Sequence, residues 1–531
     1  MKTFLFSLAA FFSCSLICAQ ITFQKTYGGS NDDFSTAIQQ TTDGGYIIVG
    51  ETKSFGVGNN FVDVYLIKTT DSGDTLWTKT FGTAFSDYAR SVQETGDGGF
   101  IIAGSKFFGT GADIHLIKTD SHGDSLWTKT FGGPSTDFGV SCKQTRNGGF
   151  IITGFTASYG AGGEDTYLVQ TDSLGVIAWT KTFGGTQNDE GQSVTVTSDG
   201  GYLICGSSYS FAAVPGDRNI YIMKTDSVGT LLWSKNMGGT DDEFGSSGQE
   251  TNDSGFVFTG SSRSFGTGNY ESYLIRTDKN GSLIWTKTYE IAGADLIGIS
   301  VYKCNDEGFV LSGTISGTSS SDGYLIKTDS SGIIQWSKTY GGASIESLGS
   351  VEQTTDGGFI MAGVSQSFGA GNRDVYVVKT DSLGVSGCHE TNVSIISTTV
   401  NMPSTNPATI ISSGGALSST PAFILNHGAI ITSLCGPTVN TEIPYSEEMI
   451  SVVPNPLVNS GMIIFSLSKR QHISLTLYDM NGRCSSILSD RVVEAGEHTW
   501  MLNADGLESG IYFLRKETES EIINLKIIIL K

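Results

Sequence analysis

The chain has 531 residues, of which 69 are glycine and only 9 proline, and 38% are hydrophobic. This balance excludes a disordered or collagen-like chain, and the length favours two or three domains over one core. A net charge of −21, with no Lys/Arg cluster, excludes nucleic acid as a partner.

The first 19 residues have the pattern of a secretory signal peptide. Lys2 gives a positive start, an apolar run extends from Phe4 to Leu16, and Cys18-Ala19-Gln20 offers small residues for cleavage. The apolar run is too short to be a transmembrane helix, and we expect the signal peptide to be cleaved after Ala19. A lipoprotein signal is the alternative, although Ile17 is bulky where such a signal has a small residue. No later segment is apolar over about 18 residues, so the sequence predicts no transmembrane helix.

Residues 20–387 contain seven copies of one unit. The tryptophans recur at intervals of 50 to 54 residues: Trp77, Trp127, Trp179, Trp233, Trp285 and Trp336. Each unit has four strand-like segments, which in Ser91–Gly133 are SVQET, FIIAGS, DIHLIKTD and LWTKTFGG, separated by Gly, Asp and Ser turns. Such a meander cannot bury both faces alone, so the sequence predicts an all-β, seven-bladed β-propeller; a linear β-solenoid is the alternative.

The two ends of the repeat region predict a closed ring. The last unit, Ser347–Asp381, lacks the fourth, Trp-bearing strand. Phe23–Gly29 matches that missing strand, with Phe23 in the position of Trp. We therefore expect the N-terminal strand to complete blade seven, which removes free sheet edges from the ring.

The repeat resembles known propeller repeats. Its D-S-x-G-x-x-x-W-x-K-T-F-G-G and D-G-G-F/Y-I-I motifs are similar to those of secreted Bacteroidota proteins and, loosely, to quinoprotein-type propellers. The resemblance covers about residues 21–387. It implies the architecture and carries no information on a ligand.

Two series of acidic residues are the candidate ligand-binding or cation-binding groups. One comes six residues after the last aromatic of each unit: Asp33, Asp87, Asp137, Asp189, Glu243, Asp295 and Glu346. The other opens the third strand: Asp63, Asp113, Asp165, Asp217 or Asn219, Glu271, Asp322 and Asp374. We expect both on one propeller face, where carboxylates could hold Ca²⁺ or a glycan. The alternative is that each acid accepts hydrogen bonds from its own turn.

Other patterns favour a scaffold over a catalytic site. We expect the Trp series to pack blade against blade. The six His residues never recur as a set, and no nucleophile elbow, phosphate loop or His-Glu-x-x-His motif is present. Carboxylates across blades could serve glycoside hydrolysis, but no pair is distinguished. The sequence therefore predicts no catalytic residue and no cofactor, with Ca²⁺ as the one cation left open.

Residues 388–436 are rich in Ser, Thr, Ile, Asn and Pro, with a loose period near 15 residues. We expect a few short strands stapled by a Cys388–Cys435 disulfide, or else an extended stalk. The remaining propeller cysteines lie in strand patterns and are expected to be buried: Cys142, Cys205 and Cys304. Without zinc-ligand spacing, the cysteines point to no metal site. Residues 437–449 have the composition of a linker.

Residues 450–531 predict a small Ig-like β-sandwich, from alternating runs such as ISLTLYDMNG and GIYFLRKE. Their motifs closely resemble the type A C-terminal sorting domain of the type IX secretion system. The matching residues include Pro454, Asn455, Pro456, Gly482, Gly496, Gly510, Tyr512 and Lys526. The resemblance implies the type IX secretion machinery as a partner and passage across the outer membrane. An ordinary accessory sandwich is the alternative.

Together these patterns predict a secreted or cell-surface protein, monomeric, that binds glycan or protein ligands through one propeller face. A secreted polysaccharide-acting hydrolase and a structural surface component are the alternatives.

Overall fold

The computed structural model describes residues 20–56, 61–109, 111–212, 214–266, 268–317, 320–418, 423–426, 430–435, 450–453, 460–467, 469–479, 483–503, 506–518 and 522–529. The chain divides into two compact units, Met1–Thr438 and Val439–Lys531. The predicted signal peptide lies outside the described residues. Within those ranges no helix is long and apolar enough to cross a membrane.

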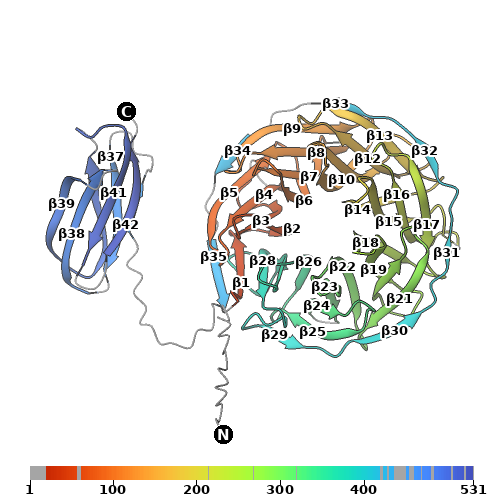
Figure 1. Ribbon diagram of the computed structural model, residues 1–531. Coiled ribbons are helices and arrows are strands. Elements are labelled where there is room, and N and C mark those ends of the chain that lie inside the picture. Colours follow the sequence, from red (N-terminus) through yellow and green to blue (C-terminus); the bar gives the residue numbers. More distant parts are fainter. Residues whose placement is uncertain are drawn as a thin grey trace, which may run out of the picture. The chain divides into compact units, whose positions relative to one another are not determined.

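The first unit is a ring of seven antiparallel sheets around a central axis (Figure 1), so the predicted propeller is confirmed. In blade one the strands from the axis outward are β2 (Asp33–Gln40), β3 (Tyr46–Thr52), β4 (Asp63–Thr69) and β5 (Thr75–Gly82). Blades two to six repeat this order with β6 (Asp87–Glu94), β7 (Phe100–Phe107), β8 (Ala112–Thr119) and β9 (Ser125–Gly132); β10 (Asp137–Gln144), β11 (Phe150–Thr156), β12 (Asp165–Thr171) and β13 (Ile177–Gly184); β14 (Asp189–Val196), β15 (Tyr202–Ser208), β16 (Asn219–Thr225) and β17 (Leu231–Met237); β18 (Glu243–Glu250), β19 (Phe256–Ser262), β20 (Glu271–Thr277) and β21 (Leu283–Glu290); β22 (Asp295–Lys303), β23 (Phe309–Ser316), β24 (Ser321–Thr328) and β25 (Ile334–Tyr340).

Blade seven closes the ring with strands from both ends of the repeat region. Its inner strands are β26 (Glu346–Gln353), β27 (Phe359–Ser365) and β28 (Asp374–Thr380), and its fourth strand is β1 (Phe23–Gly28). β1 pairs antiparallel with β28, from Phe23 opposite Lys379 to Tyr27 opposite Val375. The predicted closure by the N-terminal strand is therefore confirmed.

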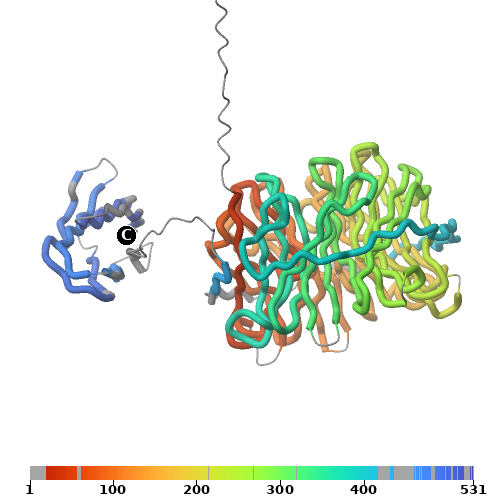
Figure 2. The backbone as a smooth tube through the Cα atoms, turned by 90° about the horizontal axis from the view of Figure 1, so that it is seen from below, coloured from red at the N-terminus to blue at the C-terminus, as the bar shows by residue number. Residues whose placement is uncertain are grey.

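A fifth strand on every blade comes from residues 390–435, which we call the belt. It runs around the outside of the ring in reverse blade order (Figure 1), from blade six through blade one to blade seven. Its strands are β29 (Glu390–Asn392) on β25, β30 (Ile396–Val400) on β21, β31 (Ser404–Thr405) on β17, β32 (Ile410–Ser412) on β13, β33 (Ala416–Ser418) on β9, β34 (Phe423–Asn426) on β5 and β35 (Ile430–Cys435) on β1. Each blade's outer edge is thus paired, as the belt crossing the blades in Figure 2 illustrates.

The belt advances in regular steps and ends where it began. The belt residues opposite the last large side chain of each outer strand are Glu390, Ser397, Ser404, Ile411, Leu417, Ile424 and Ile431. Every step is thus seven residues except one of six. A disulfide joins Cys388 to Cys435, with Cα atoms 5.8 Å apart. The belt is therefore a covalently closed loop around the propeller, which the sequence analysis had treated as a separate segment.

The tryptophans pack blade against blade. Trp77 of blade one contacts Phe100 of blade two, with ring centroids 5.9 Å apart. Gly123, in the next blade's turn at φ 76°, lies so close that a Cβ there would be 2.6 Å from the Trp77 ring. Phe23 takes this role in blade seven, 6.1 Å from Tyr46. The Asp-Ser-x-Gly turn and the tryptophan therefore recur together because they touch across each junction.

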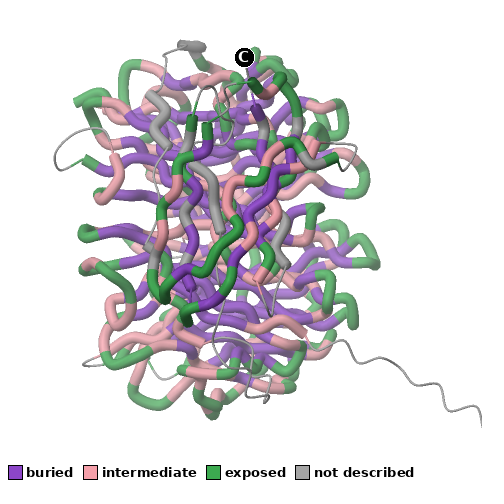
Figure 3. The backbone as a smooth tube through the Cα atoms, turned by 90° about the vertical axis from the view of Figure 1, so that its left-hand side faces the viewer, coloured by how far each residue is buried: buried purple, intermediate pink, exposed green. Residues whose placement is uncertain are grey.

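The second unit is a two-sheet β-sandwich. One sheet contains β36 (Ile450–Val453), β37 (Ser460–Leu467) and β40 (Gly496–Asn503); the other contains β38 (Gln471–Asp479), β39 (Cys484–Val493), β41 (Gly510–Glu517) and β42 (Ile522–Ile529). Buried Ile463, Leu475 and Leu514 belong to one core between the sheets. In Figure 3 the strands of the first unit are mostly buried and its turns exposed, whereas the strands of the second unit carry buried and exposed residues along their length.

Candidate functional site

The first acidic series opens the innermost strands and is held by the turns before them. Asp33 is wholly buried and accepts hydrogen bonds from the Gly29 N–H at 2.8 Å and the Ser54 hydroxyl at 2.6 Å. The corresponding backbone bonds reach Asp137, Asp189, Glu243 and Glu346 at 2.7 to 2.8 Å. Asp87 accepts a bond from the Thr83 hydroxyl at 2.9 Å, and Asp295 is only half-buried. Six of the seven acids thus accept a hydrogen bond from the turn before their own strand, whereas Asp295 accepts the Tyr270 N–H of blade five at 2.9 Å.

The second series lies beside the first, inside the blade junctions. Asp63, Asp165 and Asp374 are at most 1% exposed, and Asp113 and Asp322 are half-buried. In blade four the position belongs to Asn219, the first residue of β16, and Asp217 lies in the loop before it. The two series share one end of the blades, as expected. Their burial in the junctions replaces the open acidic face that the sequence analysis anticipated.

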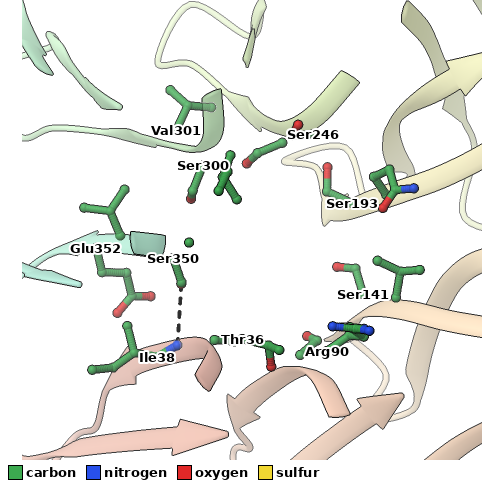
Figure 4. Close-up of a pocket in the computed structure, with 18 of the residues that line it drawn as sticks. Thr36, Ile38, Arg90, Ser141, Ser193, Ser246, Ser300, Val301, Ser350 and Glu352 are labelled. Carbon is green, nitrogen blue, oxygen red and sulfur yellow. Dashed lines mark hydrogen bonds between the residues drawn. The ribbon is translucent and has the colours of Figure 1, made fainter. Parts of the chain in front are cut away.

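A cavity of about 430 Å³ lies on the propeller axis, lined by the seven innermost strands (Figure 4). Each of these strands carries a β-bulge at the same place. The bulged residues all line the cavity: Thr36, Arg90, Val140, Gln192, Ser246, Ile299 and Gly349. All seven are different, although the positions around them repeat from blade to blade.

The residue after the bulge behaves in the opposite way. It is serine in six blades and Ala37 in the first. Three of these hydroxyls accept backbone N–H bonds from the next blade: Cys142 N–H to Ser91 at 3.2 Å, Val194 N–H to Ser141 at 3.3 Å, and Ile38 N–H to Ser350 at 3.5 Å, the dashed line in Figure 4. The bulge position varies from blade to blade, and among the described residues only its two hydroxyl side chains also bond the next blade, Thr36 to the Ala89 carbonyl at 2.9 Å and Ser246 to the Gly298 carbonyl at 3.1 Å.

The charges in the cavity are unevenly distributed. Arg90 is half exposed and lies 3.5 Å from the buried Glu51 carboxylate. Lys143 lines the wall on the next blade, and Glu352 is the only carboxylate among the lining residues. Burial raises the pKa of Glu352 to about 7, against a hydrogen bond from the Gln40 N–H and the charge of Lys143. The cavity thus has cationic donors on blades two and three and a weakly acidic carboxyl on blade seven.

The described residues that line the cavity include one carboxyl group, that of Glu352. Glycoside hydrolysis uses two carboxyl groups on either side of the bond that is broken, and the lining supplies one. The described residues contain no group of three or more His, Cys, Asp or Glu side chains placed to hold a metal. Sequence reasoning missed this site because no motif marks it; the variation of one position across seven aligned units is the signal that could have found it.

Several motif residues of the second unit can be placed. Tyr512 donates its hydroxyl to the Glu508 carbonyl at 3.1 Å, Gly496 has φ 122°, and Gly510 begins β41 opposite Ile529. Lys526 lies in β42. Pro454, Asn455, Pro456 and Gly482 lie outside the described residues.

Residues 451–530 match the family model of the secretion system C-terminal sorting domain. No curated protein sequence matches the chain. Among solved structures, PorZ, a surface component of the type IX secretion system of Porphyromonas gingivalis, is 11% identical with a TM-score of 0.37; the alignment covers 95% of this chain and 60% of PorZ. Sqt1 of Chaetomium thermophilum is 10% identical with a TM-score of 0.38, over 70% of this chain and 90% of Sqt1. A Parabacteroides distasonis protein described as a glycoside hydrolase is 10% identical with a TM-score of 0.29, and the alignment covers 69% of this chain and 95% of that protein.

This chain thus spans about 60% of the length of the PorZ chain. The propeller assignment depends on the seven sheets themselves. The chain carries a type IX secretion C-terminal sorting domain behind a seven-bladed β-propeller and is exported to the cell surface or secreted.

Proposed function

We propose that the exported propeller is a binding protein that takes a glycan into its axial cavity. The observation that carries the proposal is the ring of seven different bulge residues within an otherwise repeated scaffold. A purely structural ring needs no variation at that position, whereas a ligand without sevenfold symmetry needs it.

The chemistry of the cavity favours a hydroxyl-rich ligand. Serine and threonine hydroxyls, the amides of Gln39, Gln192 and Gln249, and the cations Arg90 and Lys143 offer donors and acceptors around the wall. Its volume of about 430 Å³ lies within the usual range for small-molecule sites. A single lining carboxyl favours binding over hydrolysis, because the glycosidase mechanism needs two.

The test is a glycan array, followed by calorimetric titration of the glycans that bind. Arg90→Gln removes a charge-assisted donor and should weaken binding roughly tenfold or more. Lys279→Gln, an exposed charge in the turn before β21 that is not among the residues lining the axial cavity, is the matched control, and it also tests a second cavity that Lys279 lines. Glycans that bind equally well to both variants and to the parent would place recognition elsewhere on the surface. Products released from a bound polysaccharide would instead favour the hydrolase.

A further inference from the structure

Carboxyl groups meet in pairs where neighbouring blades join. Asp165 opens β12 of blade three and Asp189 opens β14 of blade four, and both lie against Gly184. A Cβ on Gly184 would overlap Asp165 Oδ1 and stand 2.7 Å from Asp189 Oδ2, so the two carboxyl groups approach each other over that glycine. The same arrangement places Asp374 and Asp33 over Gly28. This contact explains why the first glycine of the Phe-Gly-Gly motif has no side chain.

The two members of a pair have different surroundings. Asp189 is wholly buried, and its Oδ2 accepts the Gly185 N–H and the Ser210 hydroxyl, both at 2.7 Å. Asp165, 1% exposed, accepts the Ala161 N–H on Oδ2 at 2.7 Å. Its Oδ1, which points to the pair, receives no hydrogen bond from any described residue. Asp374 Oδ1 is in the same situation. Donors therefore favour the ionised form of the inner-strand acid, and nothing does so for its partner's facing oxygen.

No basic group neutralises the Asp165–Asp189 pair within the described structure. The titratable side chain that faces both acids is Tyr221 of β16. Two more carboxylates, those of Glu164 and Glu190, repel each other across the same junction. Arg218 Nη1 lies 4.0 Å from Glu190 Oε2. Two buried carboxylates side by side repel each other, so one of them favours its neutral form. Burial, with Asp189 adding to it, raises the pKa of Asp165, and burial raises the pKa of Asp189.

One junction shows what the neutral partner looks like. Between blades four and five, Asn219 occupies the position of Asp165 and lies with Glu243 over Gly238. An asparagine has the shape of a protonated aspartic acid and can turn an N–H donor toward the facing carboxylate. The chain thus keeps the geometry at this junction with a partner that cannot ionise.

We infer that the paired junction acids share one proton: the third-strand carboxyl stays neutral and donates its O–H to the inner-strand carboxylate. At Asp165 this hydrogen bond supplies the missing contact of Oδ1, and Asp374 would do the same with Asp33. Raised pKa values have a defined effect on stability. The bound proton stabilises the folded ring at low pH, and that stabilisation is lost as the pH rises through the folded-state pKa. The junctions that hold such a pair therefore loosen in alkaline medium, whereas the junction with Asn219 does not.

The test compares the Tm of Asp165→Asn with that of the reverse change, Asn219→Asp. Both substitutions are made in the full mature chain, and the buffer contains a chelator. Asp165→Asn copies the neutral acid, so its Tm should match the parent at pH 5 and exceed it at pH 8 by on the order of 2 °C. Asn219→Asp should melt like the parent at pH 5 and below it at pH 8. Asp71→Asn, at an exposed turn, controls for the loss of one negative charge.

A second measurement does not depend on stability. At pH 5, where the test expects the pair to hold its proton, the infrared carbonyl band of protonated carboxylic acids should be weaker in Asp165→Asn than in the parent. The inference is overturned if Asp165→Asn destabilises the ring equally at both pH values with that band unchanged. It is also overturned if Ca²⁺ raises the parent's Tm at pH 8 and Asp165→Asn abolishes the effect, since the pair would then bind a metal ion.

Discussion

Replacing both Cys388 and Cys435 with serine should weaken the ring while leaving every strand of the belt in place. The disulfide closes a loop with a sequence separation of 47 residues. Restricting a loop of this length in the unfolded chain stabilises the folded state by about 4 kcal/mol at 25 °C. For a unit of this size, a loss of that amount lowers the Tm by about 5 °C. The double replacement avoids leaving one reactive thiol behind.

Calorimetry of the parent and the double variant, with and without reductant, measures the effect. Reductant should lower the Tm of the parent toward that of the variant and leave the variant unchanged, because the free cysteines that the structure describes, Cys142, Cys205 and Cys304, are buried and form no disulfide to reduce. Hydrogen exchange should speed up first in β35 and β1, the strands next to the disulfide. If variant and parent melt at the same temperature, the belt is held by its strand pairing alone and the loop-closure reasoning is wrong.

Two further changes test the packing of the ring. Deleting Gln20–Gly29 removes β1, which pairs with both β28 and β35, so the truncated chain should melt well below the parent and lose belt protection in hydrogen exchange; an unchanged melt would contradict the closure of blade seven. Gly184→Ala places a methyl group against Asp165 and should cost about 1–3 kcal/mol in chemical denaturation. Gly96→Ala, whose Cβ meets only Gln144 at 3.7 Å, should cost far less, and equal losses would argue against the crowding at Gly184.

The fold could be predicted because its determinants are local and repeated. Each unit carries its own turn residues, its Trp and its buried strand, and Phe23 stands where the last unit lacks a tryptophan. The belt could not be read in the same way. A strand added to a sheet edge binds mainly through its backbone, so its side chains need little in common. The period near 15 residues corresponds to about two belt steps of seven. It therefore predicted short strands but did not indicate that they pair with the outer strands of the blades.

The candidate sites were predictable only in part, for reasons of register and neighbours. Asp33 and Asp374 were assigned correctly to one end of the blades, but their burial depends on the next blade, which no single repeat contains. Arg90 and Gln192 were not singled out because a β-bulge inserts them into the strand alternation. The alternation of the surrounding strand says nothing about which residue faces the axis.

The topology of the first unit sets the order in which it can close. β1 lies between β28 and β35 in the sheet of blade seven. This blade is therefore complete only when the N-terminal strand β1, the strands β26 to β28 and the last belt strand β35 have paired. These pairings join residues at least 348 positions apart, and contacts of such separation form late in folding because long loops must close first. Cys435 reaches Cys388 only at the end of the belt's last strand, after the belt has passed all seven blades. The disulfide is therefore expected to form last, in an oxidising compartment such as the periplasm. It links the finished ring to the point from which the chain continues into its sorting domain.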